Sequence, residues 1–164
     1  MTERSEPRVG LGIDVHRLVP ERRLVLGGVE IPYALGLDGH SDADVLTHAL
    51  CDALLGAAGL GDIGTHFPDT DERYRGISSL RLLEAVMTEL VEVGYRPVNV
   101  DATLIAQAPK LTPHFAEMRV RLGGILRLPA DRIGLKATTS EGLGALGRGE
   151  GIAAWCVCLI ERGG

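Results

Sequence analysis

The sequence contains few cysteines, and they form no paired motif. Cys51, Cys156 and Cys158 are an odd number with no Cys-x-x-Cys spacing, which argues against a disulfide framework and favours reduced thiols in a cytoplasmic protein. The sequence also lacks an apolar run of about 18 residues, so we expect no membrane span. Residues 1–7 are polar and lack the apolar segment of a signal peptide, and we expect them to be flexible.

Positive charge is scarce as well. The chain has 17 Lys and Arg against 22 Asp and Glu, a net charge of -5, which argues against a nucleic-acid binder held by a general basic field. Only two of the basic residues are lysines, Lys110 and Lys136, and each lies at a predicted strand end. A lysine ammonium is a compact charge that suits a phosphate group. Chance placement of the two lysines is the alternative.

The motifs of several common enzyme classes are missing. Residues 59–67 have a glycine spacing that lets the backbone approach a ligand closely, but no Gly-Lys-Ser/Thr follows, so they are not a Walker loop. No Ser-His-Asp or Cys-His signature for a protein nucleophile is evident. Because the sequence shows no linker and no internal repeat, we expect residues 8–164 to form a single domain.

The most informative stretch of the sequence is residues 40–62. Ser41 is a good helix N-cap, and Asp44 three residues later can complete a capping box. Asp44, His48 and Asp52 then recur at i, i+4 and i+8, so they share one side of the predicted helix. A histidine flanked by carboxylates could serve a metal site or catalysis, with Asp52 or Asp44 orienting it. The alternative is a histidine at the edge of the core, satisfied by Asp52.

A second candidate site lies in the first predicted strand, residues 8–16, where apolar residues alternate with glycine and polar residues. Asp14 and His16 are two residues apart and therefore share a face, next to two glycines that leave room above the backbone. An Asp-x-His pair can supply two metal ligands at once. Polar residues on one strand face are more often simply solvated.

The remaining pattern predicts an α/β or α+β fold, with a small mixed β-sheet and helices packed on one face. The last strand is apolar on both sides, so something is expected to cover its second face, and other copies of the chain are a reasonable candidate. The predicted elements after the first strand are a hairpin over 24–31 that turns at Gly27-Gly28, the helix over 45–55, a helix from Ser78 or Ser79 to about 93, a strand over 98–107, a helix over 112–126 and strands over 132–138 and 152–160.

Several short motifs are distributed over the chain. They are Gly12-Ile13-Asp14-Val15-His16, His40-Ser41-Asp42-Ala43-Asp44-Val45, Gly61-Asp62-Ile63-Gly64, Phe67-Pro68-Asp69-Thr70-Asp71, Ala106-Gln107-Ala108-Pro109-Lys110, Lys136-Ala137-Thr138-Thr139 and Gly147-Arg148-Gly149-Glu150-Gly151. Each motif alone is weak, but together they resemble the 2-C-methyl-D-erythritol 2,4-cyclodiphosphate synthase family. The resemblance runs from about residue 8 to the end of the chain with almost no gaps.

The resemblance implies an enzyme of the non-mevalonate route to isoprenoids, a divalent-metal-dependent phosphorus–oxygen lyase. Its substrate would be 4-diphosphocytidyl-2-C-methyl-D-erythritol 2-phosphate, whose 2-phosphate attacks the β-phosphorus so that CMP leaves. Because nucleophile and electrophile belong to one molecule, such a site mainly has to fold the substrate and neutralise its charge. Two rival functions stay open: a metal-dependent phosphohydrolase that uses water, and a non-catalytic trimeric binder of isoprenoid diphosphates.

By the same resemblance, Asp14, His16 and His48 would hold Zn²⁺ with a fourth position left open. Glu141 would hold a second cation, Mg²⁺ or Mn²⁺, at the diphosphate. His40 and Thr139 resemble residues that stabilise the transition state through hydrogen bonds.

The resemblance also implies a homotrimer whose sheets line the three-fold axis and whose active sites lie between subunits. Arg148 would reach a cavity on that axis that binds an isoprenoid diphosphate; Ala145, where many relatives have an aromatic residue, departs from the family there. The full set of implied substrate-binding residues is Asp14, Val15, His16, His40, Ser41, Asp62, Ile63, Gly64, Phe67, Pro68, Asp69, Thr70, Asp71, Ala106, Gln107, Ala108, Pro109, Lys110, Leu111, Thr112, Thr138, Thr139, Ser140, Glu141, Ala145 and Arg148.

Overall fold

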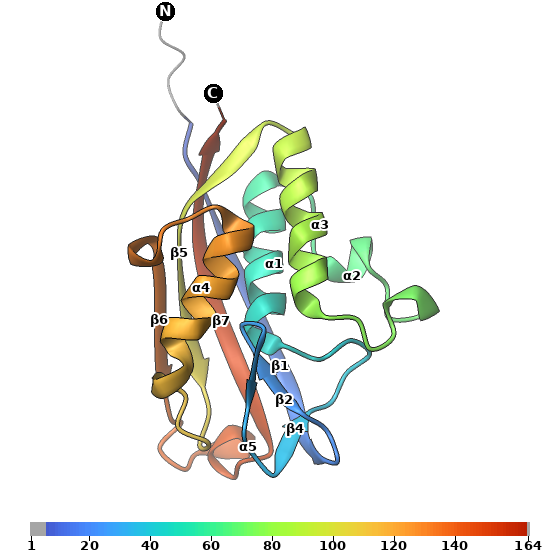
Figure 1. Cartoon of the computed structure of the whole chain (residues 1–164), viewed down its shortest axis with the longest axis vertical. Helices are drawn as coiled ribbons and strands as arrows, with labels where there is room; N and C mark the ends of the chain where they lie inside the picture. Colours follow the sequence, from blue (N-terminus) through green and yellow to red (C-terminus); the bar gives the residue numbers. More distant parts are fainter. Residues whose placement is uncertain (1–5, 164) are drawn as a thin grey trace, which may run out of the picture.

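A computed structural model describes residues 6–163. A five-stranded sheet forms one layer, and the three long helices α1, α3 and α4 cover one face of it (Figure 1). The expected mixed sheet with helices on one face is therefore confirmed. Residues 1–5, part of the N-terminal segment expected to be flexible, lie outside the described residues.

The sheet has the strand order β4-β1-β7-β5-β6, in which β5 and β6 are parallel and the other pairs are antiparallel. Its strands are β1 (Arg8–Pro20), β4 (Leu35–Leu37), β5 (Tyr95–Ile105), β6 (Ile133–Thr138) and β7 (Gly151–Arg162), and a separate hairpin consists of β2 (Leu24–Leu26) and β3 (Val29–Ile31). The helices are α1 (Val45–Ala58), α2 (Ile63–His66), α3 (Ser79–Glu92), α4 (Phe115–Leu126) and α5 (Gly144–Gly147), with short 3-10 turns at Glu72–Tyr74, Thr112–His114 and Ala130–Arg132.

The inner face of β1 is the one that carries glycine and polar residues. A Cβ atom on Gly12 would lie 1.8 Å from the carbonyl oxygen of Ala49, and one on Gly10 would lie 1.9 Å from that of Ala53. These glycines therefore let α1 lie directly on the strand. The sequence predicts free space above the backbone at these two glycines, and the helix α1 fills that space.

The opposite face of the sheet is open in the single chain. Its apolar side chains come from the two adjacent strands β1 and β7 and are between 37% and 67% exposed. They are Val9, Leu11, Ile13, Val15, Trp155 and Val157. The last strand is thus apolar on both sides, as expected, but the described residues cover only one of them.

The helix α1 begins at Val45, as the sequence predicts, but its N-cap differs from the prediction. The N-cap is Asp44, whose carboxylate accepts a hydrogen bond from the backbone N–H of Thr47 at 3.0 Å. The same buried carboxylate accepts the N–H groups of Gly27 and Gly28 at the β2–β3 turn, at 2.9 and 2.8 Å. The predicted cap, Ser41, lies before the helix and points toward His48 instead. Asp44 is the cap because its carboxylate accepts hydrogen bonds from the backbone N–H groups of both the helix and the β2–β3 turn.

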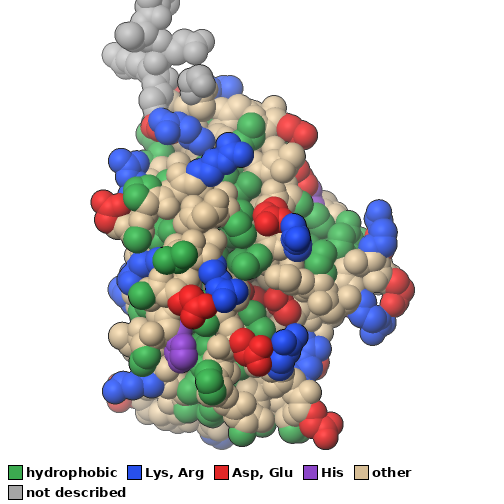
Figure 2. All heavy atoms as spheres, in the orientation of Figure 1, with side chains coloured by type: hydrophobic (Ala, Val, Ile, Leu, Met, Phe, Trp, Pro, Cys, Tyr) green, Lys and Arg blue, Asp and Glu red, His purple; other side chains and the backbone are tan. Residues whose placement is uncertain are grey.

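The helix-covered side of the molecule shows acidic and basic side chains interspersed among apolar ones (Figure 2). This view shows no broad field of one charge, in line with the low basic content of the sequence. Among residues 6–163, no helix is long and apolar enough to cross a membrane.

Candidate metal centre and its cavity

Three side chains from two elements converge at the C-terminal half of β1. The Oδ2 atom of Asp14 lies 2.9 Å from Nε2 of His16 and 3.1 Å from Nδ1 of His48, and these two nitrogens are 3.2 Å apart. Asp14 and His16 share a strand face because they are two residues apart. His48 comes from the first turn of α1, which the glycines of β1 hold close to that face.

Hydrogen bonds fix which nitrogen of each imidazole faces the cluster. Nδ1 of His16 donates to the carbonyl oxygen of Asp38 at 2.7 Å, so in the neutral ring Nε2 carries the lone pair that a metal ion would use. Nε2 of His48 lies 2.9 Å from Oγ of Ser79, and this hydroxyl donates to the carboxylate of Asp42. The hydroxyl oxygen therefore accepts from Nε2 of His48, so in the neutral ring Nδ1 carries the lone pair that a metal ion would use.

The sequence prediction named the wrong partners for His48. Asp44 is occupied by the β2–β3 turn and the cap of α1, and Asp52 accepts a hydrogen bond from the backbone N–H of Ile63 at 2.8 Å. Ser79 and, at 3.1 Å, Ser41 contact the ring instead. Ser79 lies 31 positions after His48, and the sequence around it indicates only the beginning of a helix. No local pattern could therefore reveal this contact.

The electrostatics of the cluster favour a cation. Burial disfavours the charged form of Asp14, but hydrogen bonds from His16 and His48 outweigh it and lower the pKa of Asp14 to about 2. Burial likewise opposes the charge on His16, whereas the hydrogen bond to Asp14 raises the pKa of this imidazole. The carboxylate is therefore ionised at neutral pH and is surrounded by groups that can share a positive charge.

A zinc ion fits this donor set. Two imidazole nitrogens and one carboxylate oxygen are typical of an open catalytic zinc site. In a tetrahedral site with metal–ligand distances of about 2.0–2.1 Å, ligand atoms are roughly 3.3 Å apart, close to the three separations observed here. The two ring nitrogens and the carboxylate oxygen can lie this close only with positive charge between them, either a metal ion or protons carried by the rings. Among the described residues, no other group of three His, Cys, Asp or Glu side chains comes together in this way.

A cavity of about 480 Å³ adjoins the cluster. Most of its wall comes from sequence-predicted residues, and Gly39, Tyr74 and Leu82 are additional members that the sequence analysis missed. The cavity is lined by His16, Gly39, His40, Ser41, His48, Ile63, Gly64, Phe67, Pro68, Asp69, Thr70, Tyr74 and Leu82. Tyr74 packs edge-on against Phe67, with ring centroids 5.5 Å apart, a contact with no signature in the local sequence.

Three other predicted residues, Val15, Asp62 and Asp71, do not line the cavity themselves but adjoin residues near it. Nε2 of His40 donates to the carbonyl oxygen of Asp71 at 3.0 Å, and the carboxylate of Asp62 accepts from the backbone N–H of Thr65 at 2.9 Å. The side chain of Val15 is 61% exposed on the opposite face of the sheet, so only its backbone lies near Asp14 and His16.

The second predicted set, residues 106–112 and 138–141, lies where the parallel strands β5 and β6 end and does not line this cavity. The two segments are joined by a hydrogen bond from the N–H of Ala106 to the carbonyl of Thr138 at 3.0 Å, and the Ala108–Pro109 bond is cis. Gln107, Lys110, Thr139 and Glu141 are exposed. Leu111 is only 2% exposed, so its side chain belongs to the core.

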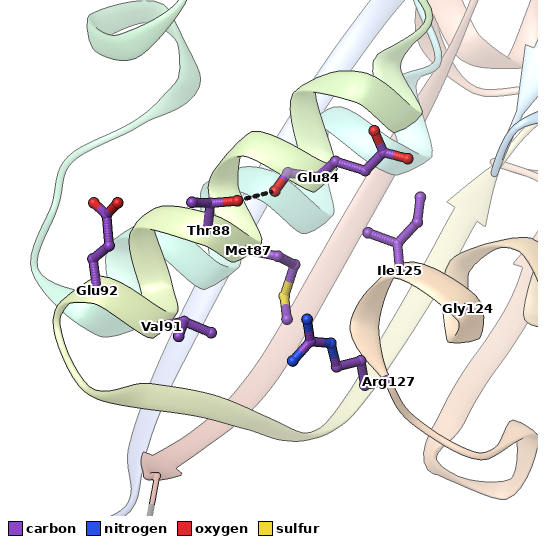
Figure 3. Close-up of a pocket in the computed structure, with 8 residues that line it drawn as sticks. All are labelled: Glu84, Met87, Thr88, Val91, Glu92, Gly124, Ile125 and Arg127. Atoms are coloured by element: carbon purple, nitrogen blue, oxygen red, sulfur yellow. Dashed lines mark hydrogen bonds between the residues drawn. The ribbon is translucent and has the colours of Figure 1, made fainter.

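The residues expected on the three-fold axis do not line this cavity either. Ala145 belongs to the short helix α5, and Arg148 follows it and forms an exposed ion pair with Glu150 at 2.6 Å. A further cavity of about 440 Å³ lies between α3 and the end of α4 (Figure 3). Its lining residues include Glu84, Met87 and Arg127 but no histidine, and none of the sequence motifs reaches it.

Comparison with known proteins places the whole chain in one group. Residues 7–161 match the model of the YgbB family. The chain is 63% identical to the 2-C-methyl-D-erythritol 2,4-cyclodiphosphate synthase of Thiobacillus denitrificans over 96% of this chain and 99% of that protein. It is 60% identical to the synthase of the same name from Lachnospira eligens over 94% and 84%.

Solved structures agree. A 2C-methyl-D-erythritol-2,4-cyclodiphosphate synthase in a CDP-bound form is similar with a TM-score of 0.86 and 44% identity, over 93% of this chain and 99% of that one. The bifunctional IspDF of Campylobacter jejuni is similar with a TM-score of 0.93 and 42% identity, over 97% of this chain and 43% of that one. A CDP complex of IspF from Plasmodium falciparum has a TM-score of 0.85 and 30% identity, over 99% and 100%.

Proposed function

The chain belongs to the YgbB family of 2-C-methyl-D-erythritol 2,4-cyclodiphosphate synthases, and from this membership we propose how its residues carry out that reaction. The substrate is 4-diphosphocytidyl-2-C-methyl-D-erythritol 2-phosphate. Its 2-phosphate oxygen attacks the β-phosphorus, the bond between that phosphorus and the CMP oxygen breaks, and the cyclic diphosphate and CMP are released. In these terms the protein is a phosphorus–oxygen lyase of isoprenoid synthesis.

The observation that carries the proposal is the convergence of Asp14, His16 and His48 beside the 480 Å³ cavity. These three residues would hold Zn²⁺, which when bound supplies a Lewis acid for a phosphate oxygen. The protein needs no nucleophile of its own, because both reacting groups belong to one molecule. Its task is to hold them together in the folded conformation, a contribution that can be worth several kcal/mol.

The cavity residues perform this positioning. Phe67, Tyr74 and Leu82 offer apolar surface to the carbon skeleton of the erythritol. His40 lies in the same wall, and its Nε2–H is already donated to the carbonyl of Asp71. Its proposed contact with a developing phosphate charge therefore requires a second proton, on Nδ1. Thr139 would stabilise the same charge from another subunit.

We propose that the enzyme is a homotrimer with active sites between subunits. The open apolar face formed by β1 and β7 supports this assembly, because exposed apolar patches of this kind mark protein interfaces. The separation between the cavity and residues 106–112 and 138–141 also supports it, since a neighbouring chain would complete the site.

Several finer assignments belong to the same proposal. Glu141 would bind Mg²⁺ or Mn²⁺ at the diphosphate, and residues 106–112 and 138–141 would hold the cytidine. Arg148 beside Ala145 would face a central cavity for an isoprenoid diphosphate. We propose that residues 8–164 form one domain and that the enzyme lies in the cytoplasm. Its three cysteines are free and buried, and burial raises the pKa of each thiol. Unpaired thiols of this kind support a reducing compartment.

Incubation with the diphosphocytidyl substrate tests the proposal. ³¹P NMR should show the cyclic diphosphate and CMP, both lost on metal removal and restored by Zn²⁺. A His48→Ala variant should bind no zinc and form no product. An uncyclised phosphate product would instead identify a hydrolase, and full activity in metal-free His48→Ala would exclude the metal-assisted mechanism. No turnover by the wild-type protein, with binding of isoprenoid diphosphates, would identify the non-catalytic binder.

A further inference from the structure

One wall of the cavity has little support from the hydrophobic core. The segment of residues 63–70 contributes six of the lining residues, yet no residue from 60 to 78 is fully buried, and only Ile63 and Phe67 of the segment pack against the core, both partly buried. A segment with few core contacts opens at low free-energy cost unless specific polar contacts hold it. The position of this wall therefore depends strongly on the hydrogen bonds and ion pairs that fasten it.

His66 makes two of these contacts from the outer side of the wall. Its Nε2 lies 2.7 Å from the carbonyl oxygen of Leu60, at the exit of α1. Its Nδ1 lies 2.8 Å from Oε2 of Glu89 in α3. The ring also packs next to Phe67, with centroids 6.2 Å apart, and Phe67 itself lines the cavity.

Both partners of His66 are hydrogen-bond acceptors. A carbonyl oxygen and a carboxylate offer no proton, so each ring nitrogen forms its hydrogen bond only as a donor. A ring that donates from both nitrogens makes a charge-assisted pair with the carboxylate. The side chains are only 22% and 31% exposed, so water screens this pair less than a surface ion pair.

We propose that His66 and Glu89 form a positioning pair that sets the location of the 63–70 wall and thereby the affinity for substrate. The pair touches neither the reacting atoms nor the metal ligands; it acts through Phe67 and its neighbours. The inference rests on the proposed function for the identity of the substrate. It adds a role to two residues that lie outside the cavity and outside the metal cluster.

The test compares His66→Gln, Glu89→Ala and the double variant with the wild-type enzyme. His66→Gln keeps a donor near the carbonyl of Leu60 but removes the charge, and Glu89→Ala removes the partner from a helix surface, where alanine is well tolerated. Each single change should raise KM by roughly three- to tenfold, with kcat within about twofold of wild type. The double variant should be no worse than the more affected single variant, because both changes remove one interaction.

Glu84→Gln provides a matched control on the same helix. Glu84 pairs with Arg81 at 2.9 Å and faces the groove toward α4 rather than the cavity wall (Figure 3). This variant should leave KM unchanged. Equal KM values for wild type, His66→Gln and Glu89→Ala would overturn the inference, as would additive effects in the double variant.

The state of the ring provides a readout that does not depend on turnover. In ¹H–¹⁵N spectra the wild-type protein should show a hydrogen-bonded proton on Nδ1 of His66, which Glu89→Ala should lose. Absence of this proton in the wild type would overturn the pairing even if the enzyme is active. Absence of cyclisation by the wild type, with this proton present, would instead refute the proposed function and leave the pair intact. If His66→Gln does not fold, Glu89→Ala carries the test.

Discussion

The hydroxyl of Ser79 lies 2.9 Å from Nε2 of His48, at the first residue of α3. Ser79 is fully buried, and its O–H is donated to Asp42, so its oxygen is directed to receive the imidazole N–H. A metal-binding histidine commonly donates its second nitrogen to a fixed acceptor in this way, which keeps the first nitrogen aimed at the metal. The start of α3 thus orients a ligand carried by α1.

Replacing Ser79 by alanine should weaken zinc binding by roughly 10- to 100-fold. The ring of His48 would lose its nearest acceptor, leaving only Ser41 at 3.1 Å. Competition with a chromophoric chelator measures the affinity directly. Ser78→Ala is the matched control, because Ser78 is exposed and makes no side-chain cap hydrogen bond. Equal affinities for the two variants would show that Ser79 does not orient His48.

Replacing Gly12 by alanine should destabilise the fold by about 3 kcal/mol or more, since the new methyl group would lie 1.8 Å from the backbone oxygen of Ala49. Gly56→Ala, within α1 and with no atom near its Cβ position, should stabilise the protein by roughly 0.5–1 kcal/mol. Urea unfolding measures both changes. If Gly12→Ala matches wild type, the close packing of α1 on β1 does not constrain this position.

Replacing Trp155 by glutamate should convert the proposed trimer to monomers. Trp155 is 37% exposed in the centre of the open apolar face, and a carboxylate there would have no partner once that face is buried. Light scattering after gel filtration gives the mass. Val120→Glu is the control, because Val120 is 72% exposed but lies on α4, on the helix side of the sheet. A trimeric Trp155→Glu variant would place the interface elsewhere.

As the pH rises, the free energy of unfolding of the wild type should fall relative to that of the Asp52→Asn variant. Burial chiefly, with the nearby charges of Asp62 and Asp14, raises the pKa of Asp52 above its usual 3.8, despite the hydrogen bond from Ile63. A carboxyl group whose pKa is higher in the folded than in the unfolded state stabilises the fold at pH values below its unfolded-state pKa. This stabilisation is lost as the pH rises through its folded-state pKa.

Urea titrations of the wild type and Asp52→Asn near pH 4 and pH 7 measure this difference. Asp52→Asn should gain stability relative to wild type at the higher pH, and its amide oxygen can still accept from Ile63. Asp52→Ala removes that acceptor as well and should raise KM. A difference between wild type and Asp52→Asn that does not change with pH would contradict the raised pKa.

The sequence by itself determined the elements and most of the candidate site. The β2–β3 turn follows from two adjacent glycines, both with positive φ of 57° and 74°. The pairing of Asp14 with His16 follows from the period of a strand, and the end of α3 from Gly94, with a φ of 83°. These are local properties, in which the residues that decide the conformation lie within a few positions of one another.

Only the tertiary structure decided which side of β1 is inside. Alternation divides the strand into two faces, but burial depends on α1, which packs on the glycine face because only there can the helix backbone approach. The same contact brings His48 to Asp14 across 34 positions. Asp44 caps α1 rather than Ser41, and Ser79 rather than Asp52 holds the imidazole, because both choices depend on partners that are distant in the chain. Such pairings follow from the packing of whole elements, which no short window of residues encodes.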